Sequence, residues 1–196
     1  FVTSQGEPGY YVVLAVADGE QTLFFVERET PGLRTKRVPG FLHDPYLDHH
    51  PEIVFESCRI PDRNRIPAGG NEGAKEWFTI ERLFIAARCC GAALRSLELA
   101  SSFAKERVQF GQPIGEFQGV SFQLADCLTE LLAARLMTYH AAHAFDVEEN
   151  RKIVHGKVAM AKLYASETAG RIVDRSLQVF GGRGYMRENA AERFFR

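Results

Sequence analysis

The stretch FTIERLF, residues 78–84, places a carboxylate beside a guanidinium at the start of an apolar segment. After Glu81 and Arg82, residues 83–94 contain a single charged side chain, Arg88. The apolar neighbours Phe78, Ile80, Leu83 and Phe84 would remove water from the Glu81 carboxylate and raise its pKa toward neutrality. A general base working near neutral pH requires this. The same residues also fit the first turn of a helix, where the dipole favours a carboxylate and Arg82 faces solvent.

A second candidate site is the segment ERVQFGQPIGEFQ, residues 106–118. Arg107 ends one helical pattern and Gln118 opens the next, with Gly111 and Pro113 as breakers between them. An arginine next to a helix N-terminus suits a phosphate or a pyrophosphate. The alternative is an interhelical turn with an arginine at a helix C-terminus.

The third candidate is QVFGGRGYMRENAAERFFR, residues 178–196, which has three glycines just after a long helical pattern. No strand precedes these glycines, so they are not a dinucleotide-binding fingerprint. They predict a glycine C-cap and turn. They would also let a ligand approach the backbone closely.

The sequence gives little evidence for a metal site, a nucleic-acid site or a membrane span. The histidines, including His49-His50, His140 and His143, lack further ligands at sensible spacing, so no metal site is expected. The net charge of −1 argues against a nucleic-acid partner. No apolar run reaches the roughly 18 residues of a membrane span. The four cysteines predict reduced core thiols of an intracellular protein.

Two kinds of element would position these candidates. The β-branched and aromatic run 10–17 and the run 22–26 flank Asp18-Gly19, which predicts a hairpin. A further strand is expected over 52–55, and a long loop over 39–51. These elements form a partial antiparallel β domain over residues 1–70.

From residue 71 onward the apolar residues recur at helical spacing. Three helices are expected over 73–107, 115–145 and 149–180, joined by short loops that imply an antiparallel bundle. The fold class is therefore α+β, with a helical bundle domain over 71–196. The β half looks incomplete, because the strands are too few to close a barrel.

The three candidate stretches, in this order, resemble the acyl-CoA dehydrogenase family of flavoproteins. Residues 178–196 resemble one family signature, and residues 107–118 resemble the flavin-binding loop. FVTS at the start resembles the strand that carries Trp-Ile-Thr, with Phe1 in the aromatic position. The resemblance covers essentially the whole chain and implies a fragment that begins inside the middle β domain and stops before the end of the C-terminal bundle.

The resemblance implies an FAD-dependent reaction. A glutamate removes the α-proton of an acyl-CoA thioester, the β-hydride passes to flavin N5, and a trans-2-enoyl-CoA results. In a minority of members the glutamate lies on the first helix of the C-terminal bundle, directly before an arginine. Glu81 falls at that position as the expected base, and Arg82 as a residue of the acyl-CoA site.

The resemblance also implies the cofactor contacts. Those near the flavin ring are Phe1, Val2 and Thr3. The adenosine and pyrophosphate side, which belongs to a neighbouring subunit's flavin, is expected to contact two groups: Arg107, Gln109, Phe110, Phe117 and Gln118, and then Gln178, Val179, Phe180, Gly181 and Gly182.

The implied partners are an acyl-CoA substrate and an electron-transferring flavoprotein, in a homodimer or homotetramer. The implied location is the bacterial cytoplasm or the mitochondrial matrix. Two rival functions remain: an acyl-CoA oxidase, which would react directly with oxygen, and a flavin-free helical scaffold related to the family.

Overall fold

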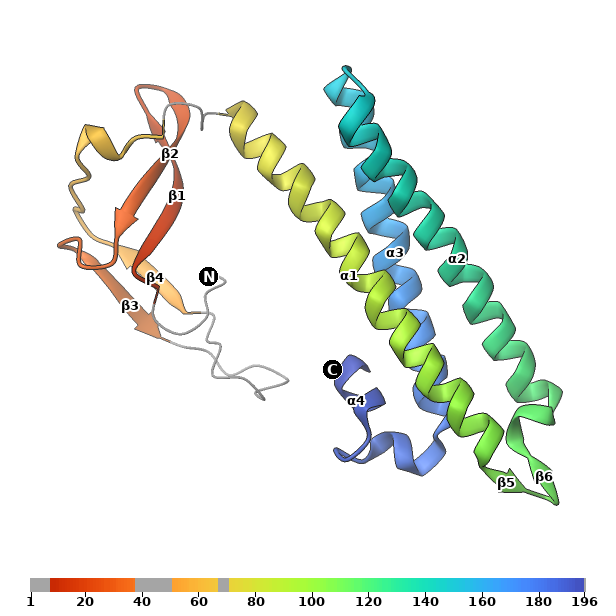
Figure 1. Ribbon diagram of the computed structural model, residues 1–196. Helices are drawn as coiled ribbons and strands as arrows, with labels where there is room; N and C mark the ends of the chain where they lie inside the picture. The colour runs from red at the N-terminus through yellow and green to blue at the C-terminus, as the bar shows by residue number, and fades with distance from the viewer. Residues whose placement is uncertain (1–7, 38–50, 67–70, 196) are drawn as a thin grey trace. The chain divides into compact units, whose positions relative to one another are not determined.

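The computed structural model describes residues 8–37, 51–66 and 71–195 of the chain (Figure 1). Two compact units result, Phe1–Trp77 and Phe78–Arg196. Small antiparallel sheets in the first unit and long helices in the second confirm the predicted α+β class. The loop expected over 39–51 and the residues Phe1, Val2 and Thr3 lie outside the described residues, except for Pro51.

The first sheet is the predicted hairpin. Strands β1 (Tyr10–Ala17) and β2 (Glu20–Glu27) pair antiparallel and in continuous register. The turn residues Asp18 and Gly19 have φ of 55° and 81°, the two positive values that a type I′ turn requires. Because this turn matches the right-handed twist of the strands, the Asp-Gly pair fixes the register.

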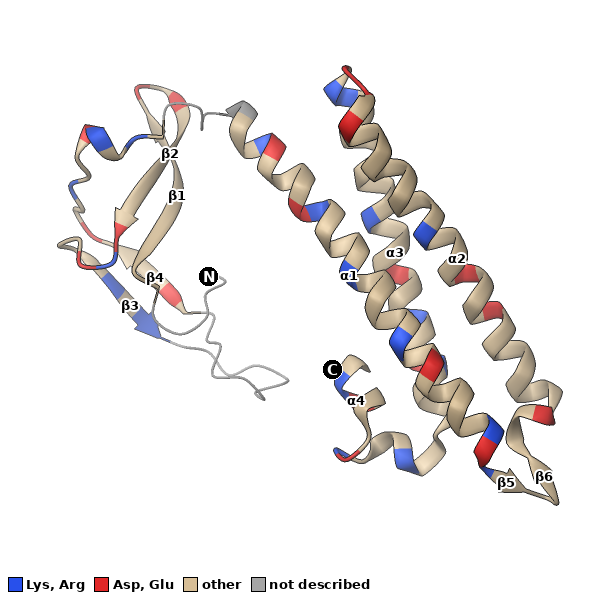
Figure 2. Cartoon of the chain, viewed as in Figure 1, with Lys and Arg blue, Asp and Glu red and all other residues tan. Residues whose placement is uncertain are grey.

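The second sheet contains a strand that the sequence pattern does not reveal. Strand β3 (Leu33–Arg37) pairs with β4 (Glu52–Phe55), followed by the short 3₁₀ helix η1 (Asp62–Asn64). Lys and Arg dominate β3 (Figure 2), and Arg34 and Arg37 donate to Glu56 and Glu52 at 2.7 and 2.6 Å. Cross-strand charge pairs replace the apolar alternation that would have predicted a strand.

Three long helices dominate the second unit: α1 (Asn71–Glu106), which enters it at Phe78, α2 (Gln118–Val147) and α3 (Arg151–Val179). All three were predicted, with ends displaced by one to three residues. Helix α2 begins at Gln118 because the preceding 3₁₀ turn η2 (Ile114–Glu116) takes the residues expected in its first turn. None of the helices in the described part of the chain is long and apolar enough to cross a membrane.

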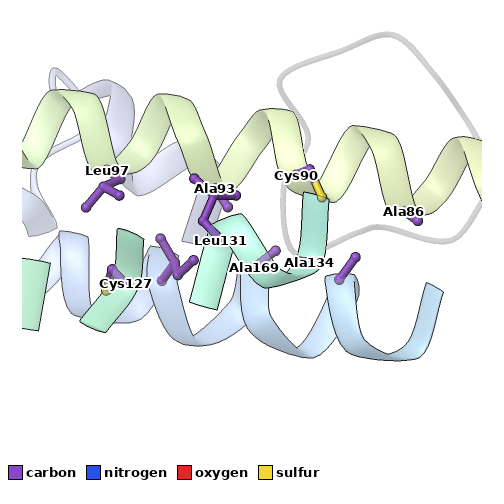
Figure 3. Close-up of a cluster of buried hydrophobic side chains, with 10 residues drawn as sticks. Ala86, Cys90, Ala93, Leu97, Cys127, Leu131, Ala134 and Ala169 are labelled. Atoms are coloured by element: carbon purple, nitrogen blue, oxygen red, sulfur yellow. The ribbon is translucent and has the colours of Figure 1, made fainter. Parts of the chain in front are cut away.

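The core of this unit is built largely from small side chains. On α1 they recur at alternating three- and four-residue spacing, so they form one stripe along the helix. Figure 3 shows this stripe facing α2 and α3. The buried cluster consists of Ala86, Cys90, Ala93, Leu97, Cys127, Leu131, Ala134, Ala165, Ala169 and Ile172. Because alanine and cysteine dominate it, the three helices can approach closely.

Two contacts near the ends of α1 show that it runs parallel to α3. The Thr79 hydroxyl lies 2.6 Å from Nδ1 of His155, and the rings of Phe103 and Phe180 lie 4.7 Å apart. The sequence separation between the partners is nearly the same at both ends. Helix α1 is therefore held in constant register with α3 along most of its length.

The described cysteines are unpaired thiols, as expected. Cys90 and Cys127 are buried, whereas Cys58 and Cys89 are half-buried. Burial raises the pKa of the Cys89 and Cys127 thiols, which keeps them protonated at neutral pH. These thiols therefore act as packing residues.

A charge cluster joins α2 to α3. Glu130 accepts from Arg171 Nε at 2.9 Å and from Arg175 Nη1 at 2.7 Å. Burial alone would raise the pKa of Glu130, but the hydrogen bonds from Arg175 and Arg171 outweigh it and hold that pKa below its ordinary value. The ionised carboxylate therefore stabilises the folded state.

We expect Glu130→Gln to lower the free energy of unfolding by about 1 kcal/mol at pH 7, since both arginines are partly solvated. A lowered carboxyl pKa gives stability that is present above the ordinary pKa and lost as the pH falls through the folded value. The difference from wild type should therefore disappear between about pH 5 and pH 3. Urea unfolding at several pH values measures it.

The matched control is Glu98→Gln. It removes an exposed ion pair within α1, in which Arg95 Nη1 lies 3.2 Å from Glu98 Oε2. Its effect should stay below about 0.5 kcal/mol. An equal loss in both variants would show that the cluster does not join α2 to α3.

Candidate functional site

Glu81 lies on the face of α1 that points away from the helical core. The buried positions around it, Thr79, Ala86 and Cys90, occupy the opposite side of the helix. The Glu81 side chain is 36% exposed, and its Oε2 lies 4.0 Å from Nη2 of Arg88. Residues seven apart share a helix face, whereas Arg82 is rotated by about 100° from Glu81 and is exposed.

Two expectations for Glu81 are wrong. Because α1 begins at Asn71, Glu81 lies in its third turn, beyond the reach of a first-turn dipole effect. The apolar residues that follow Glu81 in sequence do not bury its carboxylate either, because the buried ones face α2 and α3. Within the described residues, Glu81 is thus an accessible carboxylate with an arginine nearby.

Two of the apolar neighbours expected from the sequence are phenylalanines that are partly exposed. Phe78 and Phe84, three residues before and after Glu81, are 46% and 52% exposed. Ile85 is half-buried on the same side. They lie near Glu81 because residues three and four apart are neighbours on a helix surface.

At the other end of α1, residues 107–118 form a compact connection. Strands β5 (Val108–Gln109) and β6 (Gln112–Pro113) make a two-residue hairpin. Its turn residues, Phe110 and Gly111, have φ of 54° and 87°. A bulky residue at positive φ is strained, and Phe110 is also 95% exposed. Such a costly and solvated aromatic is typical of a residue kept for binding.

The N-terminus of α2 lies beside this hairpin. Gln118 is its first residue, as predicted, and no side chain caps the helix within the described part of the chain. Its first turn also lacks an acidic residue. The backbone N–H groups and the dipole there favour an anion. The exposed Arg107 adds a cation next to the hairpin, and the Phe117 ring meets Phe110 edge-on at 6.3 Å.

The glycine-rich segment follows α3 as the 3₁₀ turn η3 (Gly181–Tyr185) and the short helix α4 (Ala190–Phe195), which was not predicted. The glycines have different roles. Gly181 has φ of 55°, whereas a Cβ at Gly182 would meet nothing within 4 Å. A Cβ at Gly184 would lie 2.6 Å from the Leu177 carbonyl oxygen. Gly184 is therefore required for packing on α3.

The structure brings the second and third candidate groups to one end of the helical unit. The Phe103–Phe180 ring contact joins the C-terminal ends of α1 and α3, one turn before Arg107. A hollow of about 670 Å³ opens beside it, lined by Phe103, Glu106, Phe180, Arg183 and Asn189, among others. Gln178, Val179 and Gly182 lie next to this hollow in sequence, and Gln178 is exposed.

Glu81 does not belong to that group. Arg107 follows directly after α1 and is 26 positions along the chain from Glu81, which corresponds to about 39 Å at the rise of a helix. The described residues also include no group of three or more His, Cys, Asp or Glu that could hold a metal.

Residues 68–196 match the family model described as acyl-CoA dehydrogenase, C-terminal domain. The chain belongs to the acyl-CoA dehydrogenase family. It is 36% identical over its whole length to cyclohex-1-ene-1-carbonyl-CoA dehydrogenase of Geobacter metallireducens, of which it covers 53%. Over 74% of its length it is 37% identical to the caffeyl-CoA reductase-Etf complex subunit CarC of Acetobacterium woodii, of which it covers 38%.

A solved relative shares the fold. Butyryl-CoA dehydrogenase of Megasphaera elsdenii matches with a TM-score of 0.85 and 31% identity, over 95% of this chain and 50% of that one. The chain spans about half the length of the curated relatives it matches over its full length. The family resemblance read from the three motifs is thereby confirmed.

The contrast between two glycines gives a direct test of this region. Gly184→Ala should lower the free energy of unfolding by about 1–3 kcal/mol, because the new methyl group pushes η3 away from Leu177. Gly182→Ala, with open space at the same atom, should stay within about 0.5 kcal/mol of wild type. Thermal unfolding of both variants measures this, and equal effects would contradict the packing role of Gly184.

Proposed function

We propose that the protein of which this chain is part is an FAD-dependent acyl-CoA dehydrogenase that converts an acyl-CoA thioester to a trans-2-enoyl-CoA. When bound, FAD supplies the acceptor for the β-hydride, at flavin N5. The chain's own residues take the α-proton, bind the acyl-CoA and hold the cofactor. Membership of the family over the whole helical unit is the observation that carries this proposal.

Glu81 is the proposed base. Its carboxylate is accessible on the outer face of α1 and sits directly before Arg82, which we assign to the acyl-CoA site. An α-proton of a thioester is a weak acid, so the base must be aimed and freed of water when the substrate is bound. The Arg88 guanidinium lies 4.0 Å from this carboxylate, on the same face of α1.

The residues at the opposite end of the unit fit FAD. The uncapped N-terminus of α2 and the guanidinium of Arg107 suit a pyrophosphate. The exposed ring of Phe110 and the open backbone at Gly182 suit a flat adenosine. We assign to this site the two groups named from the sequence: Arg107, Gln109, Phe110, Phe117 and Gln118, with Gln178, Val179, Phe180, Gly181 and Gly182.

The distance between the two sites supports a homodimer or homotetramer. Since about 39 Å of helix separates Glu81 from Arg107, we assign them to different flavins, so that the end of α1 would serve the flavin of a neighbouring subunit. Helix α2 also carries an exposed apolar stripe opposite its buried face, formed by Leu128, Leu132, Leu136 and Tyr139. Exposed patches of this kind mark protein interfaces.

Electrons would pass to an electron-transferring flavoprotein, as the name of the Etf-complex relative suggests. The proposed location is the bacterial cytoplasm or the mitochondrial matrix. An acyl-CoA oxidase or a flavin-free scaffold would behave differently. Anaerobic reduction by substrate followed by air exposure separates them, since fast peroxide release marks an oxidase and a colourless protein marks a scaffold.

Glu81→Gln tests the base directly. In the complete enzyme we expect flavin reduction by acyl-CoA to slow at least about 100-fold, because a positioned base contributes that much or more. FAD content and acyl-CoA affinity should stay close to wild type. Stopped-flow absorbance under anaerobic conditions gives the rate, with Glu98→Gln as the control on the same helix. A reduction rate near that of wild type would rule out Glu81 as the base.

Phe110→Asn tests the cofactor site. Asparagine tolerates positive φ, so the unfolding free energy of the apoprotein should hold or rise by about 1 kcal/mol. If the Phe110 ring becomes buried against FAD when the cofactor binds, its removal should weaken FAD affinity at least about 10-fold. Fluorescence titration and urea unfolding separate the two effects. A stability loss with unchanged FAD affinity would mean that Phe110 serves only the fold.

A further inference from the structure

We propose that His155 is a positioning residue for the reaction at Glu81: through its contact with the Thr79 hydroxyl, it sets where α1 holds the carboxylate. This role rests on the proposed function and adds a residue of α3 that no sequence motif singles out. Its basis is the distance of 2.6 Å between Thr79 Oγ1 and His155 Nδ1.

The contact is a buried hydrogen bond between two helices. Thr79 is 2% exposed, and its Oγ1 lies 2.6 Å from Nδ1 and 3.5 Å from Nε2 of the His155 ring. The shorter contact works in either tautomer, because the hydroxyl donates to a bare Nδ1 and accepts from Nδ1–H. Since water is excluded from Thr79, this hydrogen bond holds it firmly against α3.

Apolar packing attaches the same part of α1 less strictly. Leu83 is half-buried and packs against a second buried cluster, formed by Ala141, Val154, Val158 and Ala161. On α1 the main buried cluster begins only at Ala86. Apolar contacts tolerate small slides of a helix, whereas a hydrogen bond fixes both a distance and a direction. Thr79 and His155 therefore define the position of the turn that carries Glu81.

The start of α3 gives His155 a firm base. Asn150 caps this helix, and its Oδ1 accepts from the Lys152 N–H at 3.1 Å. Arg151 donates to the Phe145 carbonyl oxygen at 3.2 Å, and its guanidinium lies 5.2 Å from the centre of the Phe145 ring. These contacts tie the first turn of α3 to the last turn of α2. His155 follows one turn later, on a backbone that is already held.

Thr79 and Glu81 lie in one turn of α1, on nearly opposite sides. Two residues correspond to a rotation of about 200° and a rise of about 3 Å. The Thr79 side chain meets α3, whereas the Glu81 carboxylate lies on the outer face. A shift of Thr79 toward or away from α3 therefore moves the carboxylate by a similar distance.

The ion pair of Glu81 does little to hold its carboxylate. Arg88 Nη2 lies 4.0 Å from Glu81 Oε2, and the Arg88 side chain is 71% exposed. Such a solvated pair restrains its members weakly. The position of the carboxylate then depends on the backbone of α1, and a misplacement of 1 Å can slow a reaction about 100-fold.

The test measures flavin reduction in the complete enzyme, under anaerobic conditions and per bound FAD. The probe is whichever of butanoyl-, isovaleryl-, octanoyl- and 3-phenylpropionyl-CoA reduces the wild-type flavin fastest. Thr79→Val keeps the side-chain shape without the hydroxyl, and His155→Leu removes the ring nitrogens. We expect each variant to lower the limiting rate about 10- to 100-fold. The acyl-CoA concentration at half-saturation should stay within about 3-fold of wild type.

Conservative variants should restore the rate. Thr79→Ser keeps the hydroxyl, and His155→Asn places an amide as many bonds from the backbone as Nδ1. Both should stay within about 3-fold of the wild-type rate. The matched control is Thr138→Val, which removes a buried hydroxyl 3.7 Å from Cys90 Sγ, nine residues beyond Glu81 on α1. Its rate should stay within about 2-fold of wild type.

A second background separates positioning from a structural role. Thr79→Val and His155→Leu are each combined with Glu81→Gln. If the contact acts by placing the carboxylate, either change should lower the residual rate by less than about 2-fold, because the carboxylate is already gone. A general loss of structure would lower the rate by the same factor in both backgrounds.

Three outcomes would overturn the inference. Near wild-type rates in Thr79→Val and His155→Leu, beside a slow Glu81→Gln, would do so and leave the proposed function standing. An equal fall in both backgrounds, or a like fall in Thr138→Val, would show that the contact serves only the fold. A wild-type rate in Glu81→Gln would remove the proposed base and this role together. Should Thr79→Val fail to fold, His155→Leu against His155→Asn decides.

Discussion

The close packing of α1 against α2 and α3 is the constraint on which the second unit depends. Its buried stripe of mostly small side chains packs against Leu131 and Ile172, and a rotation of α1 about its axis would put larger side chains there and overpack the core. The contacts of Thr79 with His155 and of Phe103 with Phe180 fix its register at both ends. The packing and these two contacts therefore fix which residues of α1 lie on its outer face.

That constraint divides the proposed chemistry between two ends of one helix. Glu81 and its aromatic neighbours lie in the third turn, whereas Arg107 and the strained hairpin follow the last turn. The part of α1 between Glu81 and Arg107 keeps them about 39 Å apart. If both ends serve flavin chemistry, they serve different flavins, and the shape of a single helix then requires more than one subunit.

Elements with a strong local signal were predictable from the sequence. The Asp-Gly turn, the β-branched and aromatic strands beside it and the three long helices all follow from residue type and spacing. Strand β3 was missed because ion pairs with Glu52 and Glu56 hold it, and such pairs leave no apolar period. The short α4 was missed because a six-residue helix next to glycines gives too weak a period.

Glu81 shows where such reasoning fails for a site. Apolar residues next to a carboxylate in sequence indicate burial only if they share its helix face, and here the buried ones face the opposite way. The desolvation that a base requires then has to come from whatever covers the outer face of α1. In the proposed reaction the substrate itself supplies part of that cover. Binding of the acyl-CoA and the strength of the base would then be coupled, because the bound substrate excludes water from the carboxylate.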